Sequence, residues 1–245
     1  ASPVRNNESP IYSERGLGVL TCNHKFTGNT LLKELSGTSF AAPYVTHLAG
    51  RLFNFYPKAS ANLLRALLLN HANMPAEVTS TFSEEVRQSY KKSTSRKIEC
   101  DVGGYGLIDE ESLYSSSENV VVMMVEDKIK NDEHHFYDLP FPEEFLRTKK
   151  ATRQIRVTLA YSPAVRTSRL DYVATKVNFR LVKGRSLDEV QRSFNQKHKA
   201  TTETRNDACA DKRTVGTDRR DRGTLQSCTW TLKQLKPTEK WFIVV

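Results

Sequence analysis

Apolar side chains recur at helical spacing in two consecutive segments of the first third of the chain. Over residues 39–55 they follow the i, i+3, i+4 pattern of a largely buried helix, at Val45, Leu48, Ala49, Leu52 and Phe53. Tyr56-Pro57-Lys58 ends this helix, because the residue before a proline disfavours helical backbone angles. Ser60 can then cap a second helix over 61–71, which carries Leu63, Leu64, Leu67 and Leu68.

The period of the pattern changes in the second half of the chain. The serine-rich segment 113–119 reads as a link between two domains. After it, the clearest strand covers 153–161, with Ile155, Val157, Leu159 and Tyr161 on one face. A similar strand is expected over 172–182, with Val173, Val177, Phe179 and Leu181 on one face, and shorter strands over 120–126, 135–139, 229–235 and 241–245. Period-two strands between polar turns predict an antiparallel β-sandwich.

Length and composition suit one large or two medium globular domains. The chain has 245 residues, of which 38% are hydrophobic and 27% charged. No stretch of 18 apolar residues occurs, so no membrane partner is expected. The net charge of +9 is uneven: residues 1–146 carry 14 Lys and Arg against 19 Asp and Glu, whereas 147–245 carry 23 against 9. A basic second domain would suit an acidic partner, but nucleic-acid binding is not expected because no DNA- or RNA-binding motif is present.

The cysteines and histidines predict no metal site and no cofactor. Cys22, Cys100, Cys209 and Cys228 form no Cys-x-x-Cys pair. Free thiols fit a cytoplasmic protein, which is the expected location, whereas a Cys209–Cys228 bridge would fit a secreted one. His134-His135 could contribute to a metal site, but no spaced cysteine or carboxylate set accompanies them.

The most informative stretch is 37–43, which reads Gly37-Thr38-Ser39-Phe40-Ala41-Ala42-Pro43. It places the Ser39 hydroxyl at the start of a helix, where unpaired N–H groups and the positive end of the helix dipole favour a developing oxyanion. Gly37 permits a close backbone approach and unusual φ, and the two alanines keep the first turn slim. Pro43 is tolerated in the first turn. The alternative is that Thr38 and Ser39 serve only as helix caps.

This stretch resembles the serine motif of the subtilisin-like serine proteases, Gly-Thr-Ser-x-Ala-x-Pro. A second match is Gly103-Gly104-Tyr105-Gly106-Leu107-Ile108-Asp109, which is similar to the family's turn before its last helix, here expected over 110–114. The resemblance implies that Ser39 is the catalytic nucleophile and that its backbone N–H is one oxyanion donor. It also implies an α/β fold for a first domain over residues 1–116.

The other catalytic residues of that family are not found in this chain. The triad runs Asp, His, Ser, with both partners well over a hundred residues before the serine, but only 38 residues precede Ser39 and none is aspartate. His24 lies too close in sequence, and His47 would lie about 12 Å along the helix axis. His71 would end the second helix, where the helix dipole explains it. The asparagines before the motif do not match the oxyanion asparagine: Asn6, Asn7, Asn23 and Asn29.

The opening residues 1–5 are also similar to a segment of some large bacterial subtilases. The chain is therefore expected to be a fragment that begins within a catalytic domain and is inactive alone. Its expected partners are the N-terminal remainder of that domain and a peptide or protein substrate.

A weaker resemblance concerns the second domain, residues 117–245. Val157–Ser162 followed by Leu170–Val173 resembles the jelly-roll domain that follows the catalytic domain in some large subtilases. Its aromatic residues, Tyr161, Tyr172, Trp230 and Trp241, would fill the core or line a binding surface. The leading hypothesis is a fragment of a subtilisin-like serine endopeptidase. The alternative is a non-catalytic scaffold or adaptor with a basic β-sandwich module.

Overall fold

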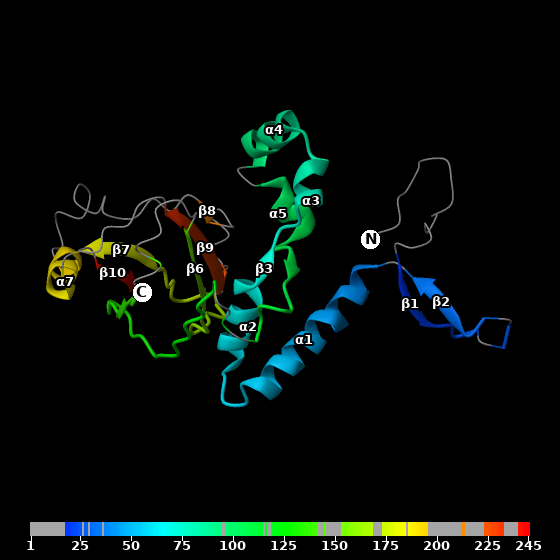
Figure 1. Cartoon of the computed structure of the whole chain (residues 1–245), viewed down its shortest axis with the longest axis horizontal. Helices are drawn as coiled ribbons and strands as arrows, with labels where there is room; N and C mark the ends of the chain where they lie inside the picture. Colours follow the sequence, from blue (N-terminus) through cyan, green and yellow to red (C-terminus); the bar gives the residue numbers. More distant parts are fainter. Residues whose placement is uncertain are drawn as a thin grey trace. The chain divides into compact units, whose positions relative to one another are not determined.

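The structure, a computed structural model, describes residues 18–25, 27–28, 30–35, 37–94, 97–114, 116, 119–141, 145, 153–168, 173–184, 186–195, 212–213, 223–232 and 240–245 (Figure 1). The chain divides into two compact units, residues 1–58 and 59–245. This division falls after the serine helix and does not test the domain boundary predicted near residue 116.

The first unit contains a β-hairpin and one long helix. Strand β1 (Val19–Cys22) pairs antiparallel with β2 (Leu32–Leu35), with Val19 opposite Leu35. A short 3-10 helix, η1 (Thr38–Phe40), leads directly into α1 (Ala41–Phe55). The predicted first helix is thus confirmed, and it ends at Tyr56, whose N–H donates to Leu52 O at 2.8 Å.

Helix α1 is much less buried than its pattern predicted. Leu48 and Leu52, four residues apart, are fully buried, but Val45 is 40% exposed and Phe53 is 49% exposed. The expectation of a largely buried helix is therefore wrong, because only a narrow stripe of α1 is buried.

The second unit begins with the predicted second helix. Helix α2 (Ala61–Asn70) is capped by Ser60, whose Oγ accepts from Leu63 N at 3.2 Å while its backbone is extended. After β3 (Ala72–Asn73) the chain forms three short helices that the sequence pattern did not predict: α3 (Ala76–Thr81), α4 (Glu84–Thr94) and α5 (Ile98–Gly103). It then returns as β4 (Leu107–Ile108), which pairs antiparallel with β3 (Figure 1).

The glycine-rich turn before β4 has the backbone geometry that requires glycine. Gly104 has φ +62° and Gly106 has φ +98°. A Cβ added at Gly106 would lie 2.1 Å from Asn73 O, so the β3–β4 pair could not form unchanged. Residues 110–114 form turns and not the predicted helix, because Asp109 accepts from Glu111 N at 3.2 Å and Leu113 N donates to Glu110 O.

Gly106→Ala should lower the free energy of unfolding by about 2–3 kcal/mol, through the left-handed φ and the contact with Asn73. Gly50→Ala is a matched control, since a Cβ at this helical position meets nothing within 4 Å. Its effect should be neutral or slightly stabilising. Urea unfolding followed by circular dichroism measures both variants, and equal stability of the two would contradict the turn geometry.

The remainder of the second unit contains two three-stranded antiparallel sheets. One has the order β5-β10-β7, from β5 (Phe136–Asp138), β10 (Lys240–Val244) and β7 (Arg180–Gly184). The other has the order β6-β9-β8, from β6 (Arg153–Ala160), β9 (Leu225–Leu232) and β8 (Lys212–Arg213). The sheets share one hydrophobic cluster, whose buried members are Phe179, Leu181, Cys228, Trp230, Leu232 and Trp241.

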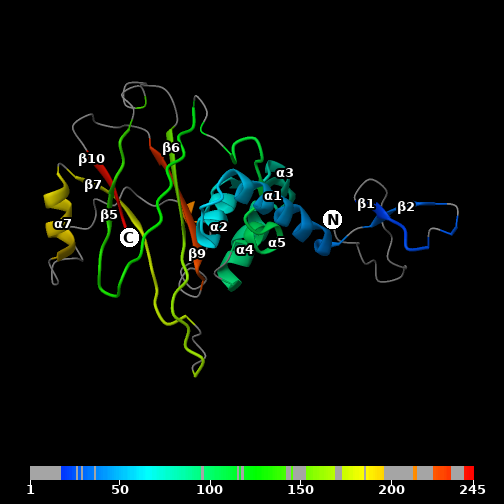
Figure 2. The same cartoon turned by 90° about the horizontal axis from the view of Figure 1, so that it is seen from below.

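The sheets are covered on their outer sides as well. Helix α7 (Leu187–Asn195) covers β7 and β10 through a second cluster that includes Val182, Val190 and Phe242. Helix α2 lies against β6 and β9. Successive residues of β10 therefore enter different clusters, Trp241 the first and Phe242 the second. Figures 1 and 2 show the resulting order: α7, one sheet, the other sheet, α2.

Several strand predictions are confirmed and two are wrong. The inward face predicted for 153–161 is confirmed at Ile155, Val157 and Leu159. Over 172–182, however, Val173 forms an isolated bridge with Val165, and the strand begins only at Arg180. Residues 121–126 form no strand. Trp230 and Trp241 lie in the core and do not line a surface, while Tyr172 lies outside the described residues.

The described part of the chain is thus a mixture of helices and small open sheets, with no closed barrel. None of its helices combines the length and apolar character needed to cross a lipid bilayer. Cys22 is an exposed thiol outside any disulfide, whereas Cys209 lies outside the described residues, so the Cys209–Cys228 alternative stays a prediction.

Candidate active site

Ser39 lies exposed at the entrance to α1. It is the middle residue of η1, and Phe40 N donates to Gly37 O at 3.1 Å to close this turn. The N-cap of α1 is Phe40, with no side-chain capping hydrogen bond. The interpretation of Ser39 as an ordinary helix cap is therefore wrong. Its hydroxyl stands instead on a short rigid turn beside the N–H groups of a 15-residue helix.

Small side chains occupy the first turn of α1, close to Ser39. Ala41, Ala42 and Pro43 form the first turn of α1 and are all exposed. Thr46 donates its hydroxyl to Ala42 O at 2.9 Å, which ties the first turn to the second. Gly37 does not adopt positive φ, and an added Cβ would make an ordinary 3.6 Å contact with Phe40. The expectation of unusual φ at Gly37 is thus wrong, and its small size is what remains relevant.

No described residue hydrogen-bonds to the Ser39 side chain. His47 is exposed on α1 eight residues further on, and His24 is exposed in the β1–β2 loop. Asn23 is engaged in that loop, with Nδ2 donating to Thr30 O at 3.0 Å and Oδ1 accepting from Lys25 N. Asn6, Asn7 and Asn29 lie outside the described residues. Among the described residues, none is placed to act as a base for the Ser39 hydroxyl.

A Ser, His and Asp constellation occurs around the end of α2, away from Ser39, and the sequence reasoning missed it. His71 Nδ1 lies 3.0 Å from Ser112 Oγ, which donates to Asp109 Oδ2 at 2.9 Å. In a catalytic triad the histidine stands between the other two residues. Here the serine stands in the middle and His71 is only 5% exposed. This arrangement is a partly buried polar network, with Asp109 exposed at its outer end, and does not have the order of a hydrolytic triad.

His71 is the C-cap residue of α2, so its predicted place at the end of the second helix is confirmed. A dipole would favour the charged ring, but burial lowers the pKa of His71 from its ordinary value of 6.5, and Arg156 lowers it further against the opposing effect of Asp109. The ring is therefore neutral at pH 7. Asp109 at the end of the Gly-x-Gly-x-x-Asp turn was the available signal for a polar partner.

The other candidate groups have structural partners. His134 packs edge-on against Phe194, with 5.4 Å between ring centroids, and His135 Nδ1 lies 2.9 Å from Asp127 Oδ2. Across the described residues, no three His, Cys, Asp or Glu side chains gather in a way that could hold a metal ion. His198 lies outside the described residues.

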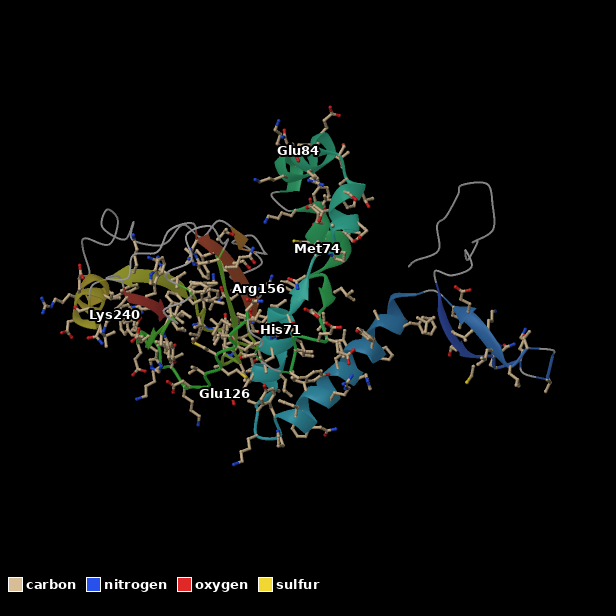
Figure 3. The ribbon with its side chains drawn as sticks, viewed as in Figure 1. His71, Met74, Glu84, Glu126, Arg156 and Lys240 are labelled. Atoms are coloured by element: carbon tan, nitrogen blue, oxygen red, sulfur yellow. The ribbon has the colours of Figure 1, made fainter. Side chains whose placement is uncertain are left out.

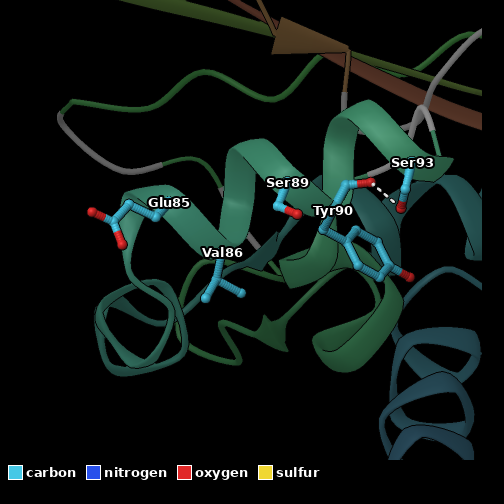
Figure 4. A pocket seen from close by; sticks show the side chains of 5 residues that line it. All are labelled: Glu85, Val86, Ser89, Tyr90 and Ser93. Atoms are coloured by element: carbon cyan, nitrogen blue, oxygen red, sulfur yellow. Dashed lines mark hydrogen bonds between the residues drawn. The ribbon is translucent and has the colours of Figure 1, made fainter.

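A shallow hollow of about 430 Å³ runs along one side of α4 (Figure 4). Its lining comes from a single helix: Glu85, Val86, Ser89, Tyr90 and Ser93. Tyr90 is held by a 2.8 Å hydrogen bond to Asp101. The lining of the hollow contains no histidine or cysteine.

Comparison with known proteins agrees with the geometry around Ser39. Residues 9–105 match the model of the subtilase family. This match includes the whole Gly37–Pro43 motif and supports a subtilisin-like serine protease domain over these residues. The "Uncharacterized protein y4bN" of Sinorhizobium fredii (strain NBRC 101917 / NGR234) is 41% identical over 171 residues, which cover 68% of this chain. The chain spans 36% of the length of that relative. No solved structure matches the chain.

Proposed function

We propose that this chain supplies the nucleophile of a subtilisin-like serine endopeptidase, and that Ser39 is that nucleophile. The observation that carries the proposal is the exposed Ser39 on η1, directly before α1 and inside the residues that match the subtilase family. Exposure gives a substrate access, and the helix end supplies favourable electrostatics for an oxyanion.

In this proposal the reaction follows the serine protease scheme. Ser39 Oγ attacks the carbonyl carbon of a peptide bond while a histidine takes its proton, and an aspartate orients that histidine. The protonated histidine then donates to the leaving amine, and water hydrolyses the acyl-serine in the second half of the cycle. The Ser39 N–H and an asparagine would hold the oxyanion. The histidine, aspartate and asparagine would come from an N-terminal part of the domain outside this chain.

Exposed apolar residues in the first unit support a partner of this kind. Leu31 is 73% exposed and Leu32 52% in the hairpin, and Tyr44 and Phe55 are 43% and 55% exposed on α1. Apolar surface of this extent suits burial against further protein. We propose that the N-terminal remainder of the catalytic domain covers it, and that residues 117–245 form a separate β-sandwich domain of jelly-roll type.

The isolated chain should fail to react with a fluorophosphonate probe, because no described residue is placed to take the proton of Ser39. Mass spectrometry of the labelled protein measures this directly, with Ser39→Ala as the background control. Adding a complete N-terminal part of the domain should switch labelling on at Ser39. Strong labelling of Ser39 in the isolated chain would contradict the proposed dependence on residues outside it.

The alternative is a non-catalytic scaffold or adaptor, which the absence of a base beside Ser39 among the described residues favours. The coding sequence upstream of residue 1 distinguishes the two. A subtilase-type aspartate and histidine there would support the enzyme, and other residues at those positions would support the scaffold.

A further inference from the structure

The β6–β9 sheet is held on α2 by a row of polar contacts along the helix. At its start, Ser162 donates to Asn62 at 3.1 Å, and one turn later Arg65 donates to Thr224 at 3.0 Å. At its end, Thr158 Oγ1 donates to Asn70 Oδ1 at 2.9 Å. The helix lies within the subtilase match, whereas β6 and β9 lie outside it. This row therefore joins the protease segment to the β-sheets.

Arg156 makes the strongest of these contacts. Its Nη1 donates to Asn70 O at 2.7 Å and to Ala72 O at 3.2 Å, and its Nη2 donates to Asn73 Oδ1 at 2.7 Å. The last carbonyls of a helix lack partners within the helix and attract cations. Arginine keeps its charge under partial burial. Arg156 is thus a charge-assisted clamp, contributed by β6, on the C-terminal end of α2.

In sequence His71 stands between Asn70 and Ala72, whose backbone carbonyls accept from Arg156. Figure 3 labels the side chains of His71 and Arg156. The Ser112 hydroxyl has one proton and gives it to the Asp109 carboxylate, so it must accept from His71 Nδ1. This assigns the hydrogen to Nδ1 and leaves Nε2 as an acceptor. Nε2 is buried, and no described residue hydrogen-bonds to it.

A proton added to His71 would therefore be poorly accommodated. It would place a new N–H at buried Nε2, where an unpaired charged donor carries a large penalty. Two charged groups of described residues act on the ring, Asp109 from the turn after β4 and Arg156 from β6. Asp109 already accepts from Ser112, while Arg156 would repel the new charge.

We propose that His71 is the proton-sensitive part of this clamp: Arg156 fastens the β6–β9 sheet to α2 while His71 is neutral, and protonation of His71 weakens the attachment. The device is independent of peptidase chemistry, because none of its residues belongs to the Ser39 motif. The strength of the contact between α2 and the β6–β9 sheet would therefore depend on pH.

The direction of the pH effect follows from proton binding. The unfolded chain takes up a proton on His71 near its ordinary pKa of 6.5, whereas burial lowers the pKa in the folded state. Between these two values only the unfolded state binds the proton. The contribution of His71 to stability is thus fully present above pH 6.5 and is lost as pH falls towards the folded-state pKa.

The test is urea unfolding of the whole chain at about pH 8 and about pH 5.5, followed by two signals. Both tryptophans of the chain lie in the sheet cluster, so their fluorescence reports the sheets, and circular dichroism reports mainly the helices. At the higher pH the two transitions should coincide. At the lower pH the helical midpoint should fall by about 1 M urea and separate from the tryptophan transition.

Three variants decide the result. His71→Asn keeps a donor for Ser112 but cannot titrate, so it should abolish most of the shift, whereas exposed His47→Asn should keep all of it. Arg156→Lys keeps the positive charge but loses the planar guanidinium group that donates several hydrogen bonds at once. It should separate the fluorescence transition from the circular dichroism transition even at about pH 8. An equal shift in His71→Asn and the wild type, or coincident transitions in Arg156→Lys at both pH values, would overturn the proposal.

Discussion

Ser39→Ala is expected to abolish peptide hydrolysis by any polypeptide that completes the subtilase domain around this chain. Under the proposed function, the substitution removes the attacking oxygen and leaves the helix entrance and the proposed oxyanion donors in place. In enzymes of this mechanism, losing the nucleophile lowers kcat by about 10⁴-fold to 10⁶-fold. Because Ser39 is exposed and caps no helix, the fold should be unaffected.

Casein cleavage and the circular dichroism spectrum measure these two expectations together. Thr46→Ala is a matched control, since it removes a nearby hydroxyl of α1 that donates only to Ala42 O. It should keep activity within a few fold of the wild type. Wild-type casein cleavage by Ser39→Ala would refute the assignment of the nucleophile.

The sequence predicts the exposed position of Ser39 before a helix, but it does not predict the polar network around His71. A helix entrance is a local feature, so the residues of 37–43 suffice to predict an exposed hydroxyl before α1. The Asp109–Ser112–His71 network joins residues about forty positions apart, and it depends on β4 returning beside β3. No periodic pattern encodes such a return. The neutral state of His71 likewise follows from burial, which the sequence does not show.

The helices α1 and α2, which have regular apolar stripes, are predicted, whereas α4 and α7 are not. Helix α4 begins with Glu84 and Glu85 and ends with Lys91 and Lys92, which suits the helix dipole but provides little apolar surface. Helix α7 was predictable, because Ser186 caps it and Glu189 stands at the third position of a capping box. The capping signal there was overlooked.

The strand errors have a physical explanation. Alternation specifies which side chains share a face, and Phe179 and Leu181 do enter the core as expected. Whether a ladder forms depends on a neighbouring strand, which alternation does not provide. Val173 accordingly makes only an isolated bridge. Arg156 illustrates the same limit: its outward direction is predictable, but the presence of α2 on that side is not.

Trp230→Ala is expected to have the largest effect on stability among the core substitutions. Trp230 is 1% exposed on β9, and its ring lies 6.0 Å from that of Phe179 in an edge-to-face arrangement. Truncating a buried aromatic side chain to alanine costs about 3–5 kcal/mol, a large share of the stability of a typical domain. Trp230→Phe keeps much of the ring and should cost far less. Urea unfolding followed by circular dichroism measures both.

The same substitution tests whether the two sheets form one core. Trp241 lies on β10 of the other sheet and belongs to the same cluster as Trp230. A double variant combines Trp230→Ala with Trp241→Ala. If the cluster is one packed unit, its loss of unfolding free energy should differ from the sum of the two single losses by at least about 0.5 kcal/mol. Strict additivity would mean that the sheets are stabilised separately. A cost below about 1 kcal/mol for Trp230→Ala would show that the indole is not buried between them.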